Sequence, residues 1–232
     1  MSNGESIHHG HRDRVRQRFL TEGLDGFNEI NALELLLFYC VPRKDTNDLA
    51  HRLLDYFGSY CNVLDAPHSE LKKVRGVSDQ VATYLKLQGE AVRYYLTKRM
   101  TPGTIINNSN DYGRMLCDYF TNRTQELVFL LCLDAKCKVL CCREIGEGSV
   151  NTVGVSIRKI VDVALSSNAT SVILAHNHPS GVAVPSAEDI NTTRLVYEAL
   201  AAIDVTLVDH VIVSDGDYTS MALSGMGFPR RN

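Results

Sequence analysis

The first hundred residues place apolar side chains at the three- and four-residue spacing of helices. Segments with this spacing lie at 32–41, 46–58 and 69–96, and the first two are bounded by capping residues, proline or glycine. Gly76 divides the last segment into a short helix, a tight turn and a longer helix. The pattern predicts a small all-α domain over residues 1–100.

Beyond residue 100 the pattern changes to an alternation of strands and helices. Residues 101–108, rich in asparagine and containing proline and glycine, are expected to form a linker. Apolar or alternating runs predict strands at 126–134, 139–146, 171–176, 205–215 and 217–223, with helices at about 110–121, 156–168 and 187–202. Because the first two strands form a hairpin, residues 109–232 are predicted to fold as an α/β (α+β) domain with a mixed sheet.

The turn Gly76-Val77-Ser78 is similar to a helix-hairpin-helix element. In such a turn the backbone N–H groups and the start of the second helix can hold a phosphate. Ser78 occupies the place where these turns usually carry a second glycine, and serine is also a good N-cap. The alternative is a turn between two helices that serves only the packing of the domain.

Charge gives limited support to a polyanionic partner, because the net charge of the chain is −3 and the first hundred residues carry 14 Lys and Arg against 13 Asp and Glu. Four arginines alternate in "RDRVRQR", where they form i,i+4 rows on a helix. Such a row is either a solvated helix face or a set of phosphate contacts. We therefore expect at most weak, sequence-independent DNA binding by the first domain. The candidate contacts are Arg14, Arg18, Gly76 and Ser78.

Composition also bears on the compartment of the protein. No apolar run approaches the roughly 20 residues of a membrane span, so no membrane association is expected. The seven cysteines are odd in number and irregularly spaced, which suits a reducing cytoplasm better than a disulfide framework. Four of them cluster at 132–142, but without the CxxC spacing of a zinc ribbon.

The segment "SVILAHNHPSGVAVPSAEDI" (171–190) carries the candidate chemistry. The two-residue period of a strand places His176 and His178 on one face at the strand end. Proline and glycine then bend the chain, so that Asp189 at the next helix start can return towards the two imidazoles. Two histidines and one carboxylate leave the fourth position of a tetrahedral zinc ion to water, which is the catalytic arrangement. Such an ion lowers the pKa of the water from 15.7 towards about 7.

Each part of this segment also has an ordinary structural explanation. Ser186 and Asp189 have the spacing of a capping box, and each histidine could be a hydrogen-bonded residue at a sheet edge. The joint pattern of two histidines, proline, glycine, serine and aspartate favours the metal site. The pair Asp209-His210 lies within a later strand, where it is either support for a metal ligand or a plain polar pair.

The motif "HNHPSGVAVPSAED" resembles the JAMM (MPN-plus) metalloprotease signature His-x-His-Pro-x-Gly followed by Ser-x-x-Asp. Over residues 10 to about 223 the chain resembles the RadC family, bacterial proteins named for DNA repair. The segments that carry this wider resemblance are "GHRDRVRQRFLTEGLDGF", "ELLLFYCVPRKDTNDLAHRLLDYFG" and "DHVIVSDGDYTS".

The resemblance implies a JAMM/MPN-like catalytic domain that binds one zinc ion per chain through His176, His178 and Asp189. It assigns Ser186 to the oxyanion of the tetrahedral intermediate. It also requires a glutamate on an earlier strand, which takes a proton from water and passes it to the leaving amine. Glu126 matches this place, because an acid that opens an apolar strand has little packing role. Its rivals are Glu144 and Glu147, and the alternative is a plain surface acid.

The expected reaction is metal-assisted hydrolysis of a peptide or isopeptide amide. A metal-dependent nuclease is one alternative, favoured by the name of the family and by the helix-hairpin-helix-like turn. A second alternative is a non-catalytic module that binds partners at DNA or at a replication fork. A complete ligand set with Glu126 argues against the last alternative, because a purely structural domain needs no open metal site.

Overall fold

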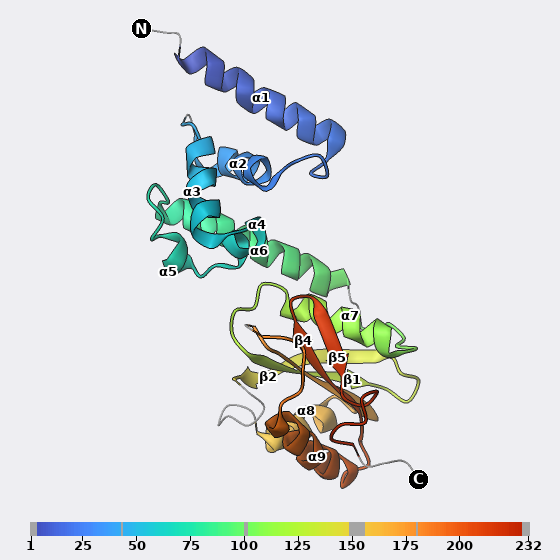
Figure 1. Ribbon diagram of the computed structural model, residues 1–232. Helices are drawn as coiled ribbons and strands as arrows, with labels where there is room; N and C mark the ends of the chain where they lie inside the picture. Colours follow the sequence, from blue (N-terminus) through green and yellow to red (C-terminus); the bar gives the residue numbers. More distant parts are fainter. Residues whose placement is uncertain (1–3, 43, 100–101, 149–155, 180, 229–232) are drawn as a thin grey trace. The chain divides into compact units, whose positions relative to one another are not determined.

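The computed structural model describes residues 4–42, 44–99, 102–148, 156–179 and 181–228 (Figure 1). The chain divides into two compact units, Met1–Val92 and Arg93–Asn232. The division falls inside a long helix, α6 (Asp79–Arg99).

The described part of the first unit contains only helices. They are α1 (Gly4–Glu22), α2 (Glu29–Cys40), α3 (Asn47–Phe57), α4 (Tyr60–Asp65), α5 (His68–Leu71) and the start of α6. Their apolar faces enclose a core whose innermost side chains are Leu33, Leu37, Leu53, Leu71 and Leu85. The predicted N-terminal all-α region is thus confirmed. None of the helices in the described ranges is long and apolar enough to cross a membrane.

The second unit is built on a five-stranded sheet with the strand order β2-β1-β3-β4-β5. The strands are β1 (Leu127–Leu133), β2 (Val139–Glu147), β3 (Ser171–Asn177), β4 (Thr206–Ser214) and β5 (Asp217–Ser220). The helices are α7 (Ser109–Phe120), α8 (Ile157–Ser166) and α9 (Ala187–Ala201). Only the β3–β4 pair is parallel, while the other three pairs are antiparallel. The predicted mixed sheet and α/β class are confirmed.

The sheet is covered on both faces, by α7 on one side and by α8 and α9 on the other (Figure 1). Alternation along β1 explains why both faces are apolar: Phe129 and Leu131 pack towards α7, whereas Val128 and Leu130 pack towards α8 and α9. All seven residues of β1 are buried, as expected for a central strand covered on both faces.

Part of the predicted linker belongs to the second unit. The Gly103 N–H donates to the carbonyl of Val139, and Ile105 forms an isolated bridge with Lys138. These contacts attach the segment to the start of β2. Composition alone could not reveal this pairing, because it depends on a partner more than thirty residues further along the chain.

Candidate metal centre

The two histidines of the motif lie at the carboxyl end of β3, on the face covered by α9. Their Nε2 atoms are 3.0 Å apart, so the two-residue period brings both rings to one point as predicted. His176 is completely buried, and burial lowers its pKa to about 4, although the Asp189 carboxylate favours the charged ring. A ring that stays neutral at pH 7 can offer a lone pair to a metal ion.

Asp189 reaches the same point from the first turn of α9. Its Oδ1 atom is 3.2 Å from Nε2 of His176, and its Oδ2 atom is 3.8 Å from Nε2 of His178. The helix begins here because Ser186 caps it, with its hydroxyl accepting from the Asp189 N–H at 3.1 Å. The start of α9 also contributes the positive end of its dipole, which favours negative charge at the site.

Glu126 immediately precedes β1, and the antiparallel pairing of β1 with β3 brings it beside the histidines. A carboxylate oxygen of Glu126 and one ring nitrogen each of His176 and His178 all lie within 4.8 Å of one another. Burial raises the pKa of Glu126, and the Asp189 carboxylate adds to this effect while His178 opposes it. A raised pKa suits a carboxylate that must both accept and release a proton near neutral pH.

The rival glutamates lie on the edge strand β2, and both are exposed. Glu144 faces Phe129 in the strand register and forms an ion pair with Arg123 at 3.7 Å. Among the described residues, the group of side chains able to share a metal ion consists of Glu126, His176 and His178, and Asp189 joins it through its contacts with the two histidines. The geometry therefore brings Glu126 to the histidines and leaves Glu144 and Glu147 outside the cluster.

The spacing of the donors fits a zinc ion. Zn–N and Zn–O bonds of about 2.0–2.2 Å in a tetrahedron place neighbouring ligand atoms about 3.3 Å apart. The corresponding separations here are 3.0 Å between the two Nε2 atoms, 3.2 Å from His176 Nε2 to Asp189 Oδ1 and 3.8 Å from His178 Nε2 to Asp189 Oδ2. In addition, Nδ1 of His178 lies 3.3 Å from the carbonyl oxygen of Val182, which can only accept a hydrogen bond. Nδ1 of His178 can therefore donate to this carbonyl, which leaves Nε2, the atom that faces the site, to offer a lone pair.

Two further polar residues support the site: Asn177, which sequence reasoning missed, and His210, for which the sequence left open either support of a metal ligand or a plain polar pair. The side chain of Asn177, between the two histidines, accepts from the Leu127 N–H at 2.8 Å and donates to the Gln125 carbonyl at 3.1 Å. These two bonds bracket Glu126 and fix the backbone that carries it. His210, on β4, contacts the ring of His176 with 2.8 Å between His210 Nε2 and His176 Nδ1. A polar side chain at a buried position of an otherwise apolar strand is the sequence signal for such a supporting role.

Ser186 lies one hydrogen bond from Asp189, one of the predicted metal ligands. Its hydroxyl donates to Oδ2 of Asp189 at 2.6 Å while accepting from the Asp189 N–H, and the Asp189 carboxylate in turn accepts from the Ser186 N–H at 2.8 Å. The capping box suggested by the sequence is therefore present. The same arrangement places the hydroxyl beside the carboxylate that would hold the ion.

The residues expected to contact DNA lie on two elements of the first unit, helix α1 and the turn before α6. Gly76 has φ of 99°, a conformation that favours glycine, and the Ser78 hydroxyl accepts from the Val81 N–H at 3.3 Å at the start of α6. Arg14 is exposed on α1. Arg18 pairs with Glu22 at 3.0 Å and packs over the Phe27 ring, so its contacts are local to the end of α1.

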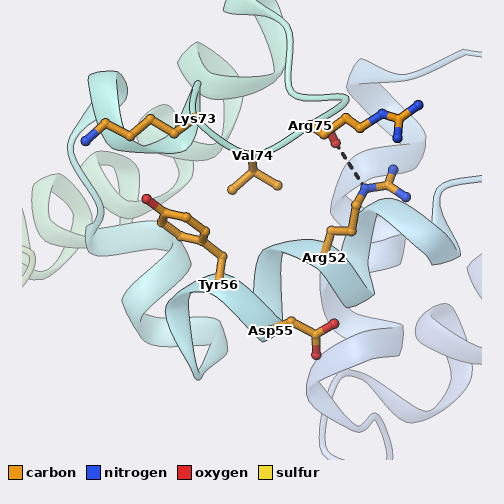
Figure 2. Close-up of a pocket in the computed structure, with 6 residues that line it drawn as sticks. All are labelled: Arg52, Asp55, Tyr56, Lys73, Val74 and Arg75. Atoms are coloured by element: carbon orange, nitrogen blue, oxygen red, sulfur yellow. Dashed lines mark hydrogen bonds between the residues drawn. The ribbon is translucent and has the colours of Figure 1, made fainter.

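Beside the Gly76 turn, the structure forms an open groove that the sequence did not reveal (Figure 2). Three cationic residues line it, namely Arg52, Lys73 and Arg75, together with Asp55, Tyr56 and Val74. Nε of Arg52 donates to the Arg75 carbonyl at 3.0 Å, which ties α3 to the chain just before the turn. Lys73 pairs with Glu70 at 2.6 Å, so the positive charge of the groove is partly compensated.

Comparison with known proteins gives a consistent result. The model of the family described as the RadC-like JAB domain matches residues 106–226, more than half of the chain. A UPF0758 protein of Fusobacterium nucleatum is 34% identical, over 96% of this chain and 99% of the relative. UPF0758 proteins of Paraburkholderia xenovorans and Rhodobacter capsulatus are each 35% identical, over 92% and 91% of this chain and 84% and 99% of their own lengths. The resemblance inferred from the motif is confirmed. The RadC-like JAB domain covers most of the second unit, and the UPF0758 relatives match nearly the whole chain. The chain therefore belongs to the RadC family, in a superfamily of metal-dependent hydrolases.

Proposed function

We propose that this protein is a zinc-dependent hydrolase of the JAMM metallopeptidase type that cleaves a peptide or isopeptide amide. The observation that carries the proposal is the convergence of His176, His178, Asp189 and Glu126 at the carboxyl end of β3. Three of these residues match the ligands of an open zinc site, and the fourth is a carboxylate with a raised pKa. The seven cysteines are free thiols, which is consistent with a cytoplasmic location.

In this proposal each residue has a distinct task. His176, His178 and Asp189 would hold the ion, which would supply Lewis acidity and lower the pKa of water. The Glu126 carboxylate takes a proton from that water and delivers it to the nitrogen of the leaving amine. Asn177 holds the backbone on both sides of Glu126, so the carboxylate keeps a fixed position relative to the histidines. The Ser186 hydroxyl, whose single proton goes to Asp189 in the structure, would turn from that carboxylate and donate to the oxyanion that forms on the substrate.

A substrate panel tests the reaction class. The zinc-loaded protein should be incubated with labelled peptides, isopeptide-linked substrates and DNA, each beside a Glu126→Gln variant. Cleavage of an amide substrate by the wild type alone supports the proposal. Cleavage of DNA that depends on Glu126 would favour a metal-dependent nuclease. No turnover of any class by a fully zinc-loaded protein would favour a non-catalytic binding module.

Substitution of Ser186 separates its capping role from its catalytic role. Ser186→Gly is expected to lower turnover by roughly 10²–10³, because the oxyanion donor is lost. Glycine is nearly as good an N-cap as serine, so the free energy of unfolding should fall by only a few tenths of a kcal/mol, against about 1 kcal/mol for Ser186→Ala. The measurements are steady-state kinetics and denaturant unfolding. If both variants retain wild-type turnover, Ser186 acts only as the cap of α9.

As a second function we propose weak, sequence-independent DNA binding by the first unit, which the basic groove beside the Gly76 turn favours. Arg52, Lys73 and Arg75 present three positive charges next to a turn whose N–H groups precede α6. Contacts of this kind neutralise phosphates and read no bases. The Lys73–Glu70 ion pair and Asp55 reduce the positive field, so the affinity should be low.

Salt dependence tests this binding. For duplex DNA, the plot of log affinity against log salt should have a slope of about −0.9 per neutralised phosphate. Lys73→Gln together with Arg75→Gln should reduce the steepness of that slope by about two, and the matched pair Arg14→Gln with Arg18→Gln shows whether α1 also contributes. Fluorescence anisotropy at several salt concentrations provides the measurement. An affinity that is independent of salt, or unchanged in both pairs, would leave the groove without a role in DNA binding.

A further inference from the structure

A chain of three hydrogen bonds runs through the buried side of the candidate metal centre. Nδ1 of His176 lies 2.8 Å from Nε2 of His210. Nδ1 of His210 lies 2.6 Å from the hydroxyl oxygen of Thr193, and that oxygen lies 2.6 Å from the backbone carbonyl of Asp189. The side chains of His176, His210 and Thr193 are inaccessible to solvent. Water therefore does not compete for these bonds.

The chemistry of the groups fixes the direction of every proton in this chain. A carbonyl oxygen only accepts, so the single proton of the Thr193 hydroxyl goes to Asp189, and the short contact between His210 and Thr193 must use the proton on His210 Nδ1. A second proton on His210 would place a charge in a fully buried site, which is costly, so Nε2 of His210 accepts from Nδ1–H of His176. It follows that the Nε2 atom of His176 carries a lone pair, and this atom faces His178 and Asp189.

We propose that His210 is a positioning residue that holds His176 in its metal-binding tautomer, with Thr193 as the anchor of His210. The inference rests on the proposed metal site but not on any particular hydrolytic reaction. The hydrogen bonds link β3, β4 and α9, and they run from one ligand, His176, to the backbone of another, Asp189. The chain thereby fixes both the orientation of the imidazole and its distance from the first turn of α9. Partners of this kind orient metal ligands and raise their basicity.

The neighbouring residue provides a matched control. Asp209 faces the opposite side of the sheet, where its Oδ2 accepts from the Tyr112 hydroxyl at 2.8 Å. Its Oδ1 accepts from the backbone N–H groups of His210 and Ala222, each at 2.8 Å. Tyr112→Phe therefore removes one buried hydrogen bond from the same part of β4 without changing the groups that contact His176. It should reduce stability without affecting the tautomer.

The experiment compares full-length His210→Phe, His210→Gln, Thr193→Val and Tyr112→Phe variants with the wild type. Phenylalanine keeps a ring but has no acceptor, whereas glutamine retains one acceptor and one donor. The zinc dissociation constant, measured by competition with a chromogenic chelator, should rise 10- to 100-fold in His210→Phe. The constant should rise less in Thr193→Val. In His210→Gln it should lie between the values of the wild type and His210→Phe, and in Tyr112→Phe it should equal the wild-type value. Circular dichroism confirms that each variant is folded.

A second readout needs no metal. Long-range proton–nitrogen correlation spectra of the metal-free, ¹⁵N-histidine-labelled protein should show His176 protonated at Nδ1, and this preference should be lost in His210→Phe. If His210→Phe does not fold, Thr193→Val tests the same chain with an isosteric change. A wild-type zinc affinity in folded His210→Phe, or an equal loss in Tyr112→Phe, overturns the inference. A wild-type protein that binds no zinc overturns instead the proposed metal site.

Discussion

A variant that carries both His176→Ala and His178→Ala is expected to lose all zinc, whereas the wild-type protein should hold about one ion per chain. The two Nε2 atoms are 3.0 Å apart and would supply both nitrogen donors of the proposed site. Without them, Asp189 and Glu126 offer only carboxylate oxygens, which hold zinc poorly in the absence of imidazole. Metal analysis after dialysis against a chelator gives the occupancy directly.

The two single variants should differ in stability, because the two rings differ in burial. The side chain of His178 is 23% exposed, so His178→Ala should lose the metal with little change in the apoprotein. His176 is completely buried, and its removal leaves His210 without its partner. His176→Ala should therefore lower the free energy of unfolding by an additional 1–3 kcal/mol or so. His51→Ala, which removes an exposed imidazole in the first unit, serves as the control. Stoichiometric zinc in the double variant would contradict the proposed ligands and would indicate binding by the cysteines of β1 and β2.

Much of this site follows from local sequence patterns. The two-residue period of β3 predicts that His176 and His178 share a face, and the capping-box spacing of Ser186 and Asp189 predicts that a helix starts there. Both inferences use neighbours within a few residues, where spacing along the chain determines spacing in the structure. The place of Glu126 came from the family resemblance, since no local pattern connects it with residues fifty positions later.

The remaining parts of the site depend on long-range pairing. Asn177 brackets Glu126 only because β1 and β3 pair in a register that brings Leu127 opposite the end of β3. His210 meets His176 because β3 and β4 run parallel, and Thr193 meets His210 because α9 packs on that face. Charge patterns have the same limitation. Arg12 looks like the other arginines of its row, yet it donates to backbone carbonyls at the end of α2, including that of Val41 at 2.8 Å.

Glu126→Gln is expected to retain the zinc ion and to lower hydrolysis by about 10²–10⁴ or more, the usual contribution of a general acid–base residue. Glutamine has the same shape as glutamate but cannot take a proton from water at neutral pH. The three residues that match zinc ligands are unchanged, so the zinc dissociation constant should stay close to that of the wild type. Glu144→Gln is the control, because Glu144 is an exposed glutamate already paired with Arg123.

A companion variant tests whether the position of Glu126 matters as much as its charge. Asn177→Ala keeps the Glu126 carboxylate itself. It removes both hydrogen bonds that hold the backbone at Gln125 and Leu127, so the position of the carboxylate is no longer fixed. Turnover should therefore fall while zinc remains bound. The loss should be smaller than in Glu126→Gln, because a mobile carboxylate can still accept a proton from water. The pH profile separates the two effects: Glu126→Gln should remove the acidic limb of the activity, whereas Asn177→Ala should preserve it at a lower rate. Wild-type turnover in Glu126→Gln, with loss in Glu144→Gln or Glu147→Gln, would transfer the proton-transfer role to the edge strand β2.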